Sequence, residues 1–206
     1  MSKRETPLSE QFKVDVPEGR SGEWFIEKFT VEDSFHLTMM MARAPKAGEA
    51  YTRLMRDKSW DNPMMSDTPA EINDLWEPYL TFKEPWVDRV LINGLGLGVV
   101  LKMALAQPHI QHIDVVEIEP DILNLVMPSY NDPRIQVHLG DAYAIQWPKG
   151  LKWAAAWHDV WPNICTDNLE GIGTLHRRYG KRVRWQGSWQ REHLQGQRRR
   201  ERNMGW

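Results

Sequence analysis

The fold of this chain is decided by one stretch, Val90 to Gly98, which reads VLINGLGLG. Its first four residues are apolar or nearly so, and three glycines follow at every second position. Glycine has no Cβ, so it permits the positive φ of a tight turn and lets a ligand approach the backbone closely. Val99 to Ala106 are helix formers without a break. The stretch therefore predicts a buried strand, a glycine turn and a helix start, where backbone N–H groups can hold a polar or anionic nucleoside ligand.

A carboxylate ends the next apolar run, Ile113 to Glu117. Glu117 lies nineteen residues past Gly98, and at the tip of a second strand it can accept both ribose hydroxyls of a nucleoside over the turn. The glycine spacing is G-x-G-x-G; the dinucleotide fingerprint G-x-G-x-x-G fits less well, because its third glycine would fall on Val99. A plain strand-to-helix turn without a ligand is the alternative.

Strand and helix patterns alternate through the rest of this region. The predicted elements are a helix to Gln107, a strand to Glu117, a helix over Pro120–Met127, strands over Ile135–Leu139 and Trp153–His158, a helix over Asn168–Tyr179 and a strand over Val183–Trp189. Such alternation implies a parallel sheet with right-handed crossovers. Ligands of these sheets lie outside the carboxyl ends of the strands. Gly94, Glu117, Asp141 and Asp159 all fall at those ends, which is the strongest evidence for a shared site.

These motifs resemble the class I methyltransferases that use S-adenosylmethionine (SAM), and in detail their spermidine synthase-like branch. The resemblance covers roughly Val87 to Gly187 and rests on the glycine turn, on VVEIEPD (115–121), on NDPRIQVHLGDA (131–142) and on the strand that ends at Asp159. It implies an α/β, three-layer Rossmann-like fold with a mostly parallel sheet in the order 3-2-1-4-5. The sheet would be shortened at its C-terminal end, because nothing after Trp189 resembles the two further strands of the family.

The resemblance also implies SAM as the cofactor and a set of residues that bind it. Glu117 would hold the ribose, Asp141 would accept the exocyclic amine of adenine, and the backbone N–H of Ala142 would read a ring nitrogen. Asp141 as a helix N-cap is the alternative. The expected cofactor-binding residues are Asn93, Gly94, Leu95, Gly96, Gly98, Glu117, Ile118, Asp141 and Ala142. One departure is Ile92, which stands where the family carries the acid that meets the methionine ammonium; either another group does this here or the ligand differs.

The expected catalytic residues are Asp159 and His158, at the end of the fourth strand. Asp159 could act as a base or hold a cation, and His158 as a base near neutral pH; a loop acid and a structural histidine are the alternatives. The chain has neither a DPPY motif nor a Pro-Cys pair. Four tryptophans crowd this region (Trp147, Trp153, Trp157 and Trp161) and would wall a substrate pocket or pack against the strands.

Three functions remain open. The first is a methyltransferase that acts on a small or modest-sized acceptor, which the residues do not identify. The second is an aminopropyltransferase that uses decarboxylated SAM, against which stands Trp161 before Pro162, where that family has the second acid of Asp-x-x-Asp-Pro. The third is a SAM- or nucleoside-binding protein without catalysis, such as a partner-binding subunit, favoured by Ile92 and the short sheet.

Composition narrows the class of protein. The chain has 206 residues, 41% of them hydrophobic, and a net charge of −2, so nothing global demands a nucleic-acid partner. Its single cysteine, Cys165, excludes an intramolecular disulfide and a cysteine cluster for a metal, and we expect no metal site. No apolar run approaches a membrane span and no signal segment follows the first residues. A cytoplasmic location is therefore expected, with no membrane contact.

The expected domain organisation has four parts. Residues 1–22 are a flexible lead-in, 23–66 an N-terminal β hairpin extension, 67–190 the Rossmann-like SAM-binding domain and 191–206 a basic, solvated tail for which nucleic-acid contact is the alternative. The hairpin would join Trp24–Val31 to Phe35–Met41, with Tyr51–Arg56 as a possible third strand. A capping box at Thr68–Glu71 would open one amphipathic helix to Leu80. A homodimer is expected, because the fifth strand is a sheet edge and the N-terminal apolar runs have no obvious place in the main core.

Overall fold

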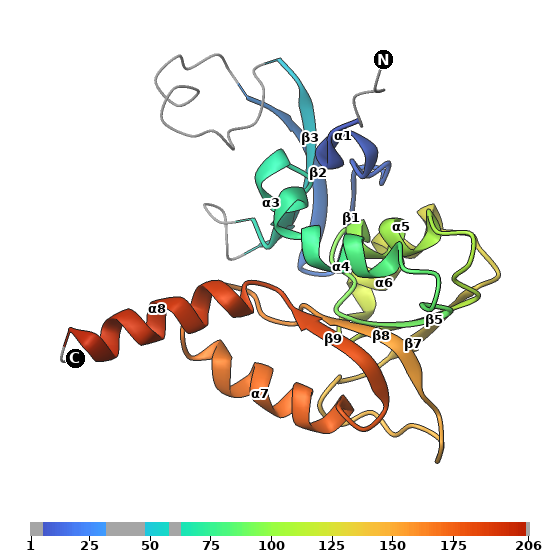
Figure 1. Cartoon of the computed structure of the whole chain (residues 1–206). Helices are drawn as coiled ribbons and strands as arrows, with labels where there is room; N and C mark the ends of the chain where they lie inside the picture. Colours follow the sequence, from blue (N-terminus) through green and yellow to red (C-terminus); the bar gives the residue numbers. More distant parts are fainter. Residues whose placement is uncertain (1–5, 32–47, 58–62, 205–206) are drawn as a thin grey trace, which may run out of the picture.

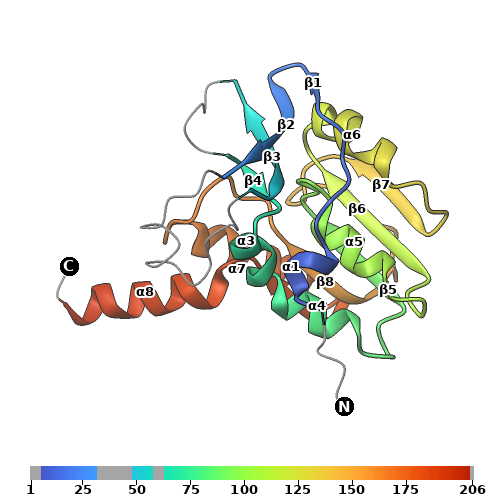
Figure 2. The ribbon, with the colours of Figure 1, turned by 90° about the horizontal axis from the view of Figure 1, so that it is seen from above.

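The computed structural model describes residues 6–31, 48–57 and 63–204, which form two sheets and the helices around them (Figures 1 and 2). The elements are, in chain order, α1 (Leu8–Gln11), β1 (Gly19–Ser21), β2 (Trp24–Thr30), β3 (Ala50–Arg56), β4 (Met65–Ser66), α3 (Pro69–Asp74), α4 (Trp76–Phe82), β5 (Arg89–Asn93), α5 (Val99–Leu105), β6 (His112–Glu117), α6 (Pro120–Val126), the 3-10 turn η1 (Met127–Ser129), β7 (Ile135–Leu139), β8 (Trp153–His158), α7 (Asn168–Tyr179), β9 (Val183–Ser188) and α8 (Arg191–Asn203).

The larger sheet has five parallel strands in the order β7-β6-β5-β8-β9. Its centre is β5, where Leu91 lies opposite Asp114 of β6 and Ala156 of β8. Helices cover β5 on both faces of this parallel sheet, so Val90, Leu91 and Ile92 form a continuous apolar run. The predicted α/β fold with a mostly parallel sheet is confirmed.

The two faces of the sheet carry separate cores. Val90 and Ile92 pack with residues of α4, α5 and α6 in one cluster. Leu91 points to the other face and packs with Leu175 and Tyr179 of α7. Figure 1 shows α7 on one side of the sheet and α4, α5 and α6 on the other. Side chains of a strand alternate between faces, so one apolar stretch supplies both cores and the molecule has three layers.

The prediction of a flexible lead-in is wrong for the described part of residues 1–22. Leu8, Phe12, Val14 and Val16 are buried in the main core cluster. The segment is fixed by Asp67, whose carboxylate accepts the backbone N–H of Val14 at 3.2 Å. The sequence pattern did not indicate this burial, because single apolar residues stand among prolines and polar residues and are buried by contacts with distant segments.

The smaller sheet is antiparallel in the order β1-β2-β3-β4, and it differs from the predicted hairpin. β2 pairs along its whole length with β3, from Trp24 opposite Arg56 to Thr30 opposite Ala50, and β1 pairs on its other edge. The predicted strand Phe35–Met41 lies outside the described residues. Trp24, Ile26 and Leu54 are buried in the main core. The N-terminal apolar runs that the structure describes therefore have a place in that core and no longer argue for a homodimer. The homodimer stays a prediction.

The expected single helix over residues 69–80 is two helices that meet at Leu75. Pro78 explains the break: it has no N–H for the carbonyl of Asp74, and its ring crowds that carbonyl, so it is tolerated only in the first turn of a new helix. A single amphipathic helix would turn Trp76 and Leu80 toward the core together with Ile72, but they are 52% and 44% exposed. The predicted capping box is also altered, since the Thr68 side chain makes no cap hydrogen bond.

The C-terminal segment forms a helix, and most of its described residues are exposed or half-buried. α8 packs on α7 near its start, where Leu194 is buried, and then extends away from the rest of the chain (Figure 1). After β9 the described residues contain no further strand. No helix within residues 6–31, 48–57 and 63–204 is both long and apolar enough to cross a membrane.

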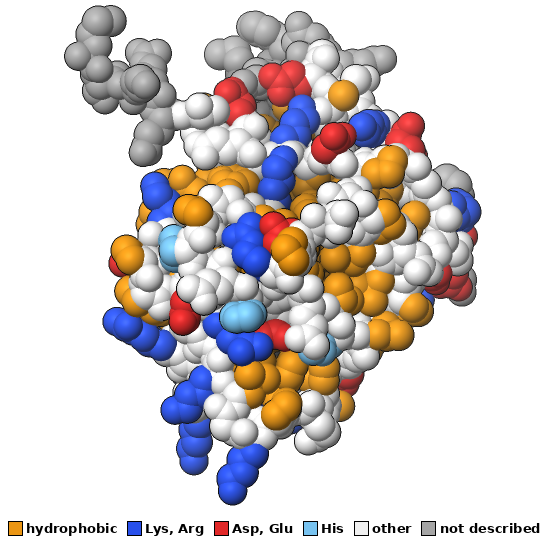
Figure 3. All heavy atoms as spheres, turned by 90° about the vertical axis from the view of Figure 1, so that its right-hand side faces the viewer, with side chains coloured by type: hydrophobic (Ala, Val, Ile, Leu, Met, Phe, Trp, Pro, Cys, Tyr) orange, Lys and Arg blue, Asp and Glu red, His pale blue; other side chains and the backbone are white. Residues whose placement is uncertain are grey.

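The outer strand β7 leaves apolar side chains in contact with solvent. Val137 is 38% exposed and Leu139 is 60% exposed. Figure 3 faces the side of the molecule on which β7 lies in Figure 1, and it shows several hydrophobic patches between charged side chains. In the strand order of this sheet, β7 and β9 are the two edge strands of the described chain.

Candidate functional site

A cavity of about 450 Å³ lies at the carboxyl ends of β5, β6, β7 and β8. The smaller sheet and α3 form its other wall, through Trp24, Met65 and Glu71 among others. This volume is within the range of about 300–1,000 Å³ that is typical of small-molecule sites. The cavity therefore lies where ligands of parallel α/β sheets bind.

The glycine turn lies in the cavity wall and each of its glycines has positive φ. The angles are 92° at Gly94, 51° at Gly96 and 81° at Gly98. A Cβ on Gly94 would lie 1.9 Å from the carbonyl oxygen of Asp159, and one on Gly96 would lie 2.5 Å from the Sδ of Met65. Gly94, Leu95 and Gly96 line the cavity, whereas Gly98 does not. Gly98 begins α5, and a Cβ there would meet the ring of Tyr130 at 2.5 Å.

Glu117, at the end of β6, closes the glycine turn from the side. One carboxylate oxygen accepts the backbone N–H of Leu95 at 2.8 Å, and the other accepts those of Ile118 at 2.8 Å and Glu119 at 3.0 Å. The side chain lines the cavity although the residue is only 6% exposed. A carboxylate has about four lone-pair sites, so this one keeps capacity for a hydroxyl donor of a ligand.

Glu117→Ala should weaken the binding of SAM by about 2 kcal/mol, roughly thirtyfold in the dissociation constant, because charge-assisted hydrogen bonds are lost. It should also lower the stability of the protein, since three backbone N–H groups lose their acceptor. Calorimetric titration and thermal unfolding measure the two effects. An unchanged SAM affinity in a folded variant would mean that the ribose does not bind here.

Asp141 and its neighbours form the cavity wall beyond β7. The Asp141 carboxylate accepts the backbone N–H of Tyr143 at 2.8 Å through one oxygen, within a turn; no helix begins there, so the alternative of a helix N-cap is wrong. Asp141 and Ala142 both line the cavity, so this hydrogen bond does not exclude a binding role. Ile118 lines it from the end of β6 and is 59% exposed. An exposed apolar side chain beside two polar groups suits a flat, hydrogen-bonding ring system.

Asp159 lies in the cavity wall directly after β8. Burial raises the pKa of its carboxyl to about 7, and the negative charges of Glu71 and Glu117 raise it further in the same direction. The carboxyl therefore changes its protonation state near neutral pH. A general base is most effective when its pKa lies in this range.

The raised pKa of Asp159 makes stability depend on pH in a defined direction. The folded protein holds the proton up to about pH 7, whereas the unfolded chain releases it near 3.8. The stabilising contribution of this carboxyl is thus complete below about pH 4 and is lost as the pH rises through about 7. We expect Asp159→Asn to raise the melting temperature relative to wild type at pH 8 and to change it little at pH 4, as measured by calorimetry. An equal shift at both pH values would contradict the raised pKa.

The structure does not bring His158 and Asn93 to the cavity. Both are completely buried and absent from its lining. Asn93 Nδ2 and His158 Nδ1 lie 2.7 Å apart, and His158 Nε2 lies 3.2 Å from the Oε1 of Gln186. Burial lowers the pKa of His158 to about 4, so it is neutral at physiological pH. Alternation along β8 turns His158 toward α7 and Asp159 toward the cavity, and we no longer propose His158 as a catalytic residue.

Sequence reasoning missed the wall that Trp24, Met65 and Glu71 contribute. Met65 packs on the glycine turn, where its Sδ accepts the backbone N–H of Leu97 at 3.3 Å. Glu71 lines the cavity from α3, and Trp24 does so from β2. No local pattern marks these residues, because the contacts join segments far apart in the chain. Of the four tryptophans that crowd residues 147–161, Trp161 lines the cavity, while Trp153 and Trp157 are buried in the two cores.

The cavity is rich in negative charge. Its described lining residues include five carboxyl groups, from Glu71, Glu117, Glu119, Asp141 and Asp159, and one guanidinium, from Arg56. Arg56 is already paired with Glu23, its Nε lying 3.1 Å from a carboxylate oxygen. Three tryptophans, Trp24, Trp161 and Trp189, also line it. Carboxylates and aromatic faces both attract cations, so this lining suits a ligand that carries positive charge.

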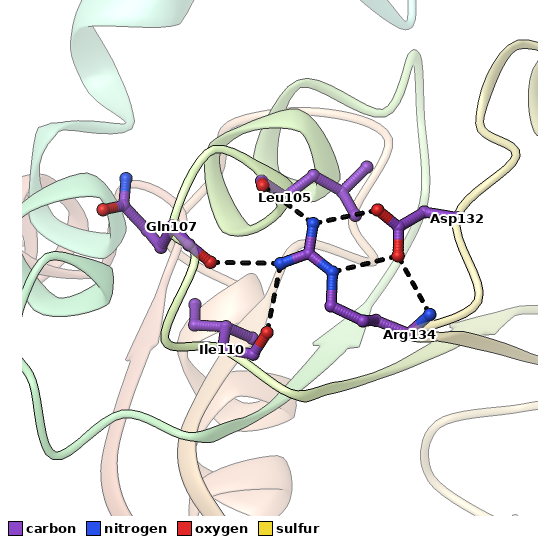
Figure 4. A network of polar contacts seen from close by, with 5 residues as sticks. All are labelled: Leu105, Gln107, Ile110, Asp132 and Arg134. Carbon is purple, nitrogen blue, oxygen red and sulfur yellow. Dashed lines mark hydrogen bonds and ion pairs between the residues drawn. The ribbon is translucent and has the colours of Figure 1, made fainter.

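Arg134 connects the segment before β7 to the end of α5 and the residues that follow it (Figure 4). Its guanidinium donates to the carbonyl oxygens of Leu105 at 2.9 Å, Gln107 at 3.1 Å and Ile110 at 3.0 Å, and it pairs with Asp132 at 2.9 Å. These carbonyls lie at and just after the end of α5, where a cation is favourable. The cluster joins the end of α5, which follows the glycine turn, to the start of β7, which leads to Asp141.

Comparison with known proteins gives a partial match. No family model matches the chain. It is 32% identical over 92 residues to putrescine N-methyltransferase 2 of Nicotiana attenuata, an overlap of 41% of this chain and 23% of that protein. The homologous protein of Nicotiana tabacum matches equally, with 24% of its length covered. The chain thus spans about a quarter of the length of the curated relatives it matches.

Solved structures of methyltransferases show a weaker likeness. The methyltransferase domain of a bacterial CtHen1 matches with a TM-score of 0.43 and 14% identity, over 54% of this chain and 63% of that one. Human N-acetylserotonin methyltransferase in complex with SAM matches with a TM-score of 0.41 and 15% identity, over 55% and 31%. SAM-bound CalS10 of Micromonospora echinaspora, an amino pentose methyltransferase, has a TM-score of 0.40 and 17% identity, over 54% and 45%. These scores are below 0.5, so the proposal below rests on the site and on the curated relatives.

Proposed function

We propose that this chain is a SAM-dependent methyltransferase of the spermidine synthase-like branch. The observation that carries the proposal is one cavity that combines the glycine turn, Glu117 hydrogen-bonded to that turn, and Asp141 and Asp159 at the neighbouring strand ends. The partial identity to putrescine N-methyltransferases supports it.

The residues present fit SAM. Glu117 would accept a ribose hydroxyl, Ile118 would pack on adenine, and Asp141 with the backbone of Ala142 would bind its polar edge. The amino-acid end would then lie over Gly94 and Gly96, toward Asp159 and α3. The excess of carboxylates over cations in the lining suits a ligand with a sulfonium and an ammonium group.

When bound, SAM supplies a methyl group on a sulfonium that is already activated. The chain's own task is to place the acceptor in line with that group and to take up its proton where it has one. Asp159 is the polar side chain that the end of β8 directs into the cavity. We propose that its carboxylate orients the acceptor and accepts the proton, with Trp161 beside it as an apolar wall.

An amine is the acceptor class that the cavity favours. Its carboxylates and tryptophans attract a cationic substrate, and the curated relatives are named for methylation of putrescine, a diamine. Aminopropyl transfer is the second candidate. It is disfavoured because Trp161, which lines the cavity, stands where a paired acid would bind a polyamine.

Transfer of a labelled methyl group tests the proposal. The protein is incubated with SAM labelled in its methyl group and with a diamine, a monoamine or no acceptor. We expect labelled N-methylated amine and an equal amount of S-adenosylhomocysteine, formed only when an amine is present. Amine-dependent release of methylthioadenosine from decarboxylated SAM, without methyl transfer from SAM, would establish the second candidate instead.

A further inference from the structure

Ile92 stands at the position where the resembled family carries an acid for the ammonium group of SAM, and its side chain does not reach the cavity. Ile92 is 1% exposed and belongs to the core cluster that packs with α4, α5 and α6. The amino-acid end of SAM nevertheless carries an ammonium group that needs an acceptor when water is excluded. If SAM binds in this cavity, its ammonium group would need an acceptor from another part of the cavity wall.

Glu71 is a carboxylate fixed in that wall. One of its oxygens accepts the backbone N–H of Ser66 at 2.7 Å, and the other accepts the hydroxyl of Ser66 at 2.6 Å. That hydroxyl also lies 2.9 Å from the hydroxyl of Thr68. The side chain is thus held in one orientation, and its carboxylate retains unused lone pairs.

The chain around Glu71 places it beside the glycine turn. Met65, the residue before its anchor Ser66, packs its Sδ on Gly96 and accepts the N–H of Leu97. Glu117 binds the backbone N–H groups of Leu95, Ile118 and Glu119 from β6. Both carboxylates line the cavity, so Glu71 adds a second acidic group from α3 to the wall that contains the turn.

The carboxyl groups of Glu71 and Asp159 give this part of the cavity a negative charge that favours a bound cation. Burial raises the pKa of Glu71, and its negative charge raises the pKa of Asp159 in turn. A positive group beside Glu71 would stabilise the ionised form of this carboxyl. No Lys or Arg of the described chain forms an ion pair with either carboxylate.

We propose that Glu71 binds the ammonium group of the amino-acid end of SAM and so replaces the acid that is absent at Ile92. The inference rests on the proposed function, because it requires SAM in this cavity. It also explains why the smaller sheet and α3 cover the glycine turn: they bring the cofactor's missing partner from outside the parallel sheet.

The test compares two ligands that share the adenosine end. S-adenosylhomocysteine carries the ammonium group, whereas 5′-methylthioadenosine lacks the amino-acid end. Glu71→Gln keeps an oxygen for Ser66 but removes the charge. We expect it to weaken the binding of S-adenosylhomocysteine on the order of tenfold or more and to leave the binding of methylthioadenosine unchanged, as measured by calorimetry.

Two further variants control this comparison. Glu119→Gln removes one charge from the same cavity at the end of β6 and should leave the ratio of the two affinities as in wild type. Glu71→Asp keeps the charge and should retain most of the ratio, which covers the case that Glu71→Gln does not fold. An equal loss for both ligands in Glu71→Gln, or an unchanged affinity for S-adenosylhomocysteine, overturns the inference. A wild-type protein that binds neither ligand overturns the proposed function itself.

Discussion

Asp159→Asn should lower the turnover of methyl transfer by roughly a hundredfold or more while the affinity for SAM stays near wild type. The side chain keeps its size and its place in the cavity wall but loses the ability to accept a proton. Because burial and two nearby carboxylates raise the pKa of Asp159 to about 7, the wild-type rate should rise with pH through about 7. The variant should lose this dependence. Initial rates between pH 6 and 9 measure both effects.

Asp167→Asn is the matched control for this variant. Asp167 is exposed in the segment after β8 and does not line the cavity. It should retain full activity. If the melting temperature of Asp159→Asn rises at pH 8 as expected, a loss of turnover in this variant does not come from unfolding. An Asn variant of full activity would remove Asp159 from the catalytic role, and the non-catalytic binding protein would then be the better hypothesis.

Gly94→Ala should lower the stability of the protein by about 3 kcal/mol or more, which corresponds to roughly 6–12 °C in melting temperature for a chain of this size. The new Cβ would lie 1.9 Å from the carbonyl oxygen and 2.8 Å from the carbonyl carbon of Asp159. Both atoms belong to the backbone at the β5–β8 junction, so the strands themselves must move apart. The variant should also lose SAM binding, since the glycine turn and Asp159 would both shift.

Gly150→Ala separates the clash from the backbone strain. Gly150 has a similar φ of 85°, but a Cβ there would meet nothing within 4 Å. It should lose only the strain of a non-glycine residue at positive φ, about 1 kcal/mol. Similar melting temperatures for the two variants would show that Asp159 does not pack against Gly94 in solution.

The central sheet could be predicted closely from the sequence. The bounds of β7 and β8 and of α7 agree with the predicted ranges. These elements have continuous apolar runs or a clear helical stripe, and proline, glycine or polar residues end them. Local chemistry decides such boundaries, and the parallel arrangement follows from the alternation of strands and helices.

The cavity could be predicted only on the side that the strand ends supply. Glu117, Asp141 and Asp159 follow apolar runs, so their place at one edge of the sheet follows from the fold. Glu71 reaches the site through contacts between distant segments, and no spacing in the sequence encodes them. The prediction of His158 as a catalytic residue was wrong for a different reason. Two adjacent polar residues at a strand end point to opposite faces of the sheet, and the sequence does not show which of them faces the cavity.

Calorimetric titration of the wild-type protein with SAM, S-adenosylhomocysteine and decarboxylated SAM tests the proposed cofactor site most directly. We predict that SAM and S-adenosylhomocysteine bind with one site per chain, that decarboxylated SAM binds more weakly than SAM, and that Glu117→Ala weakens all three. Tighter binding of decarboxylated SAM would favour aminopropyl transfer. The absence of binding of all three ligands to the folded protein would contradict a SAM site at the strand ends.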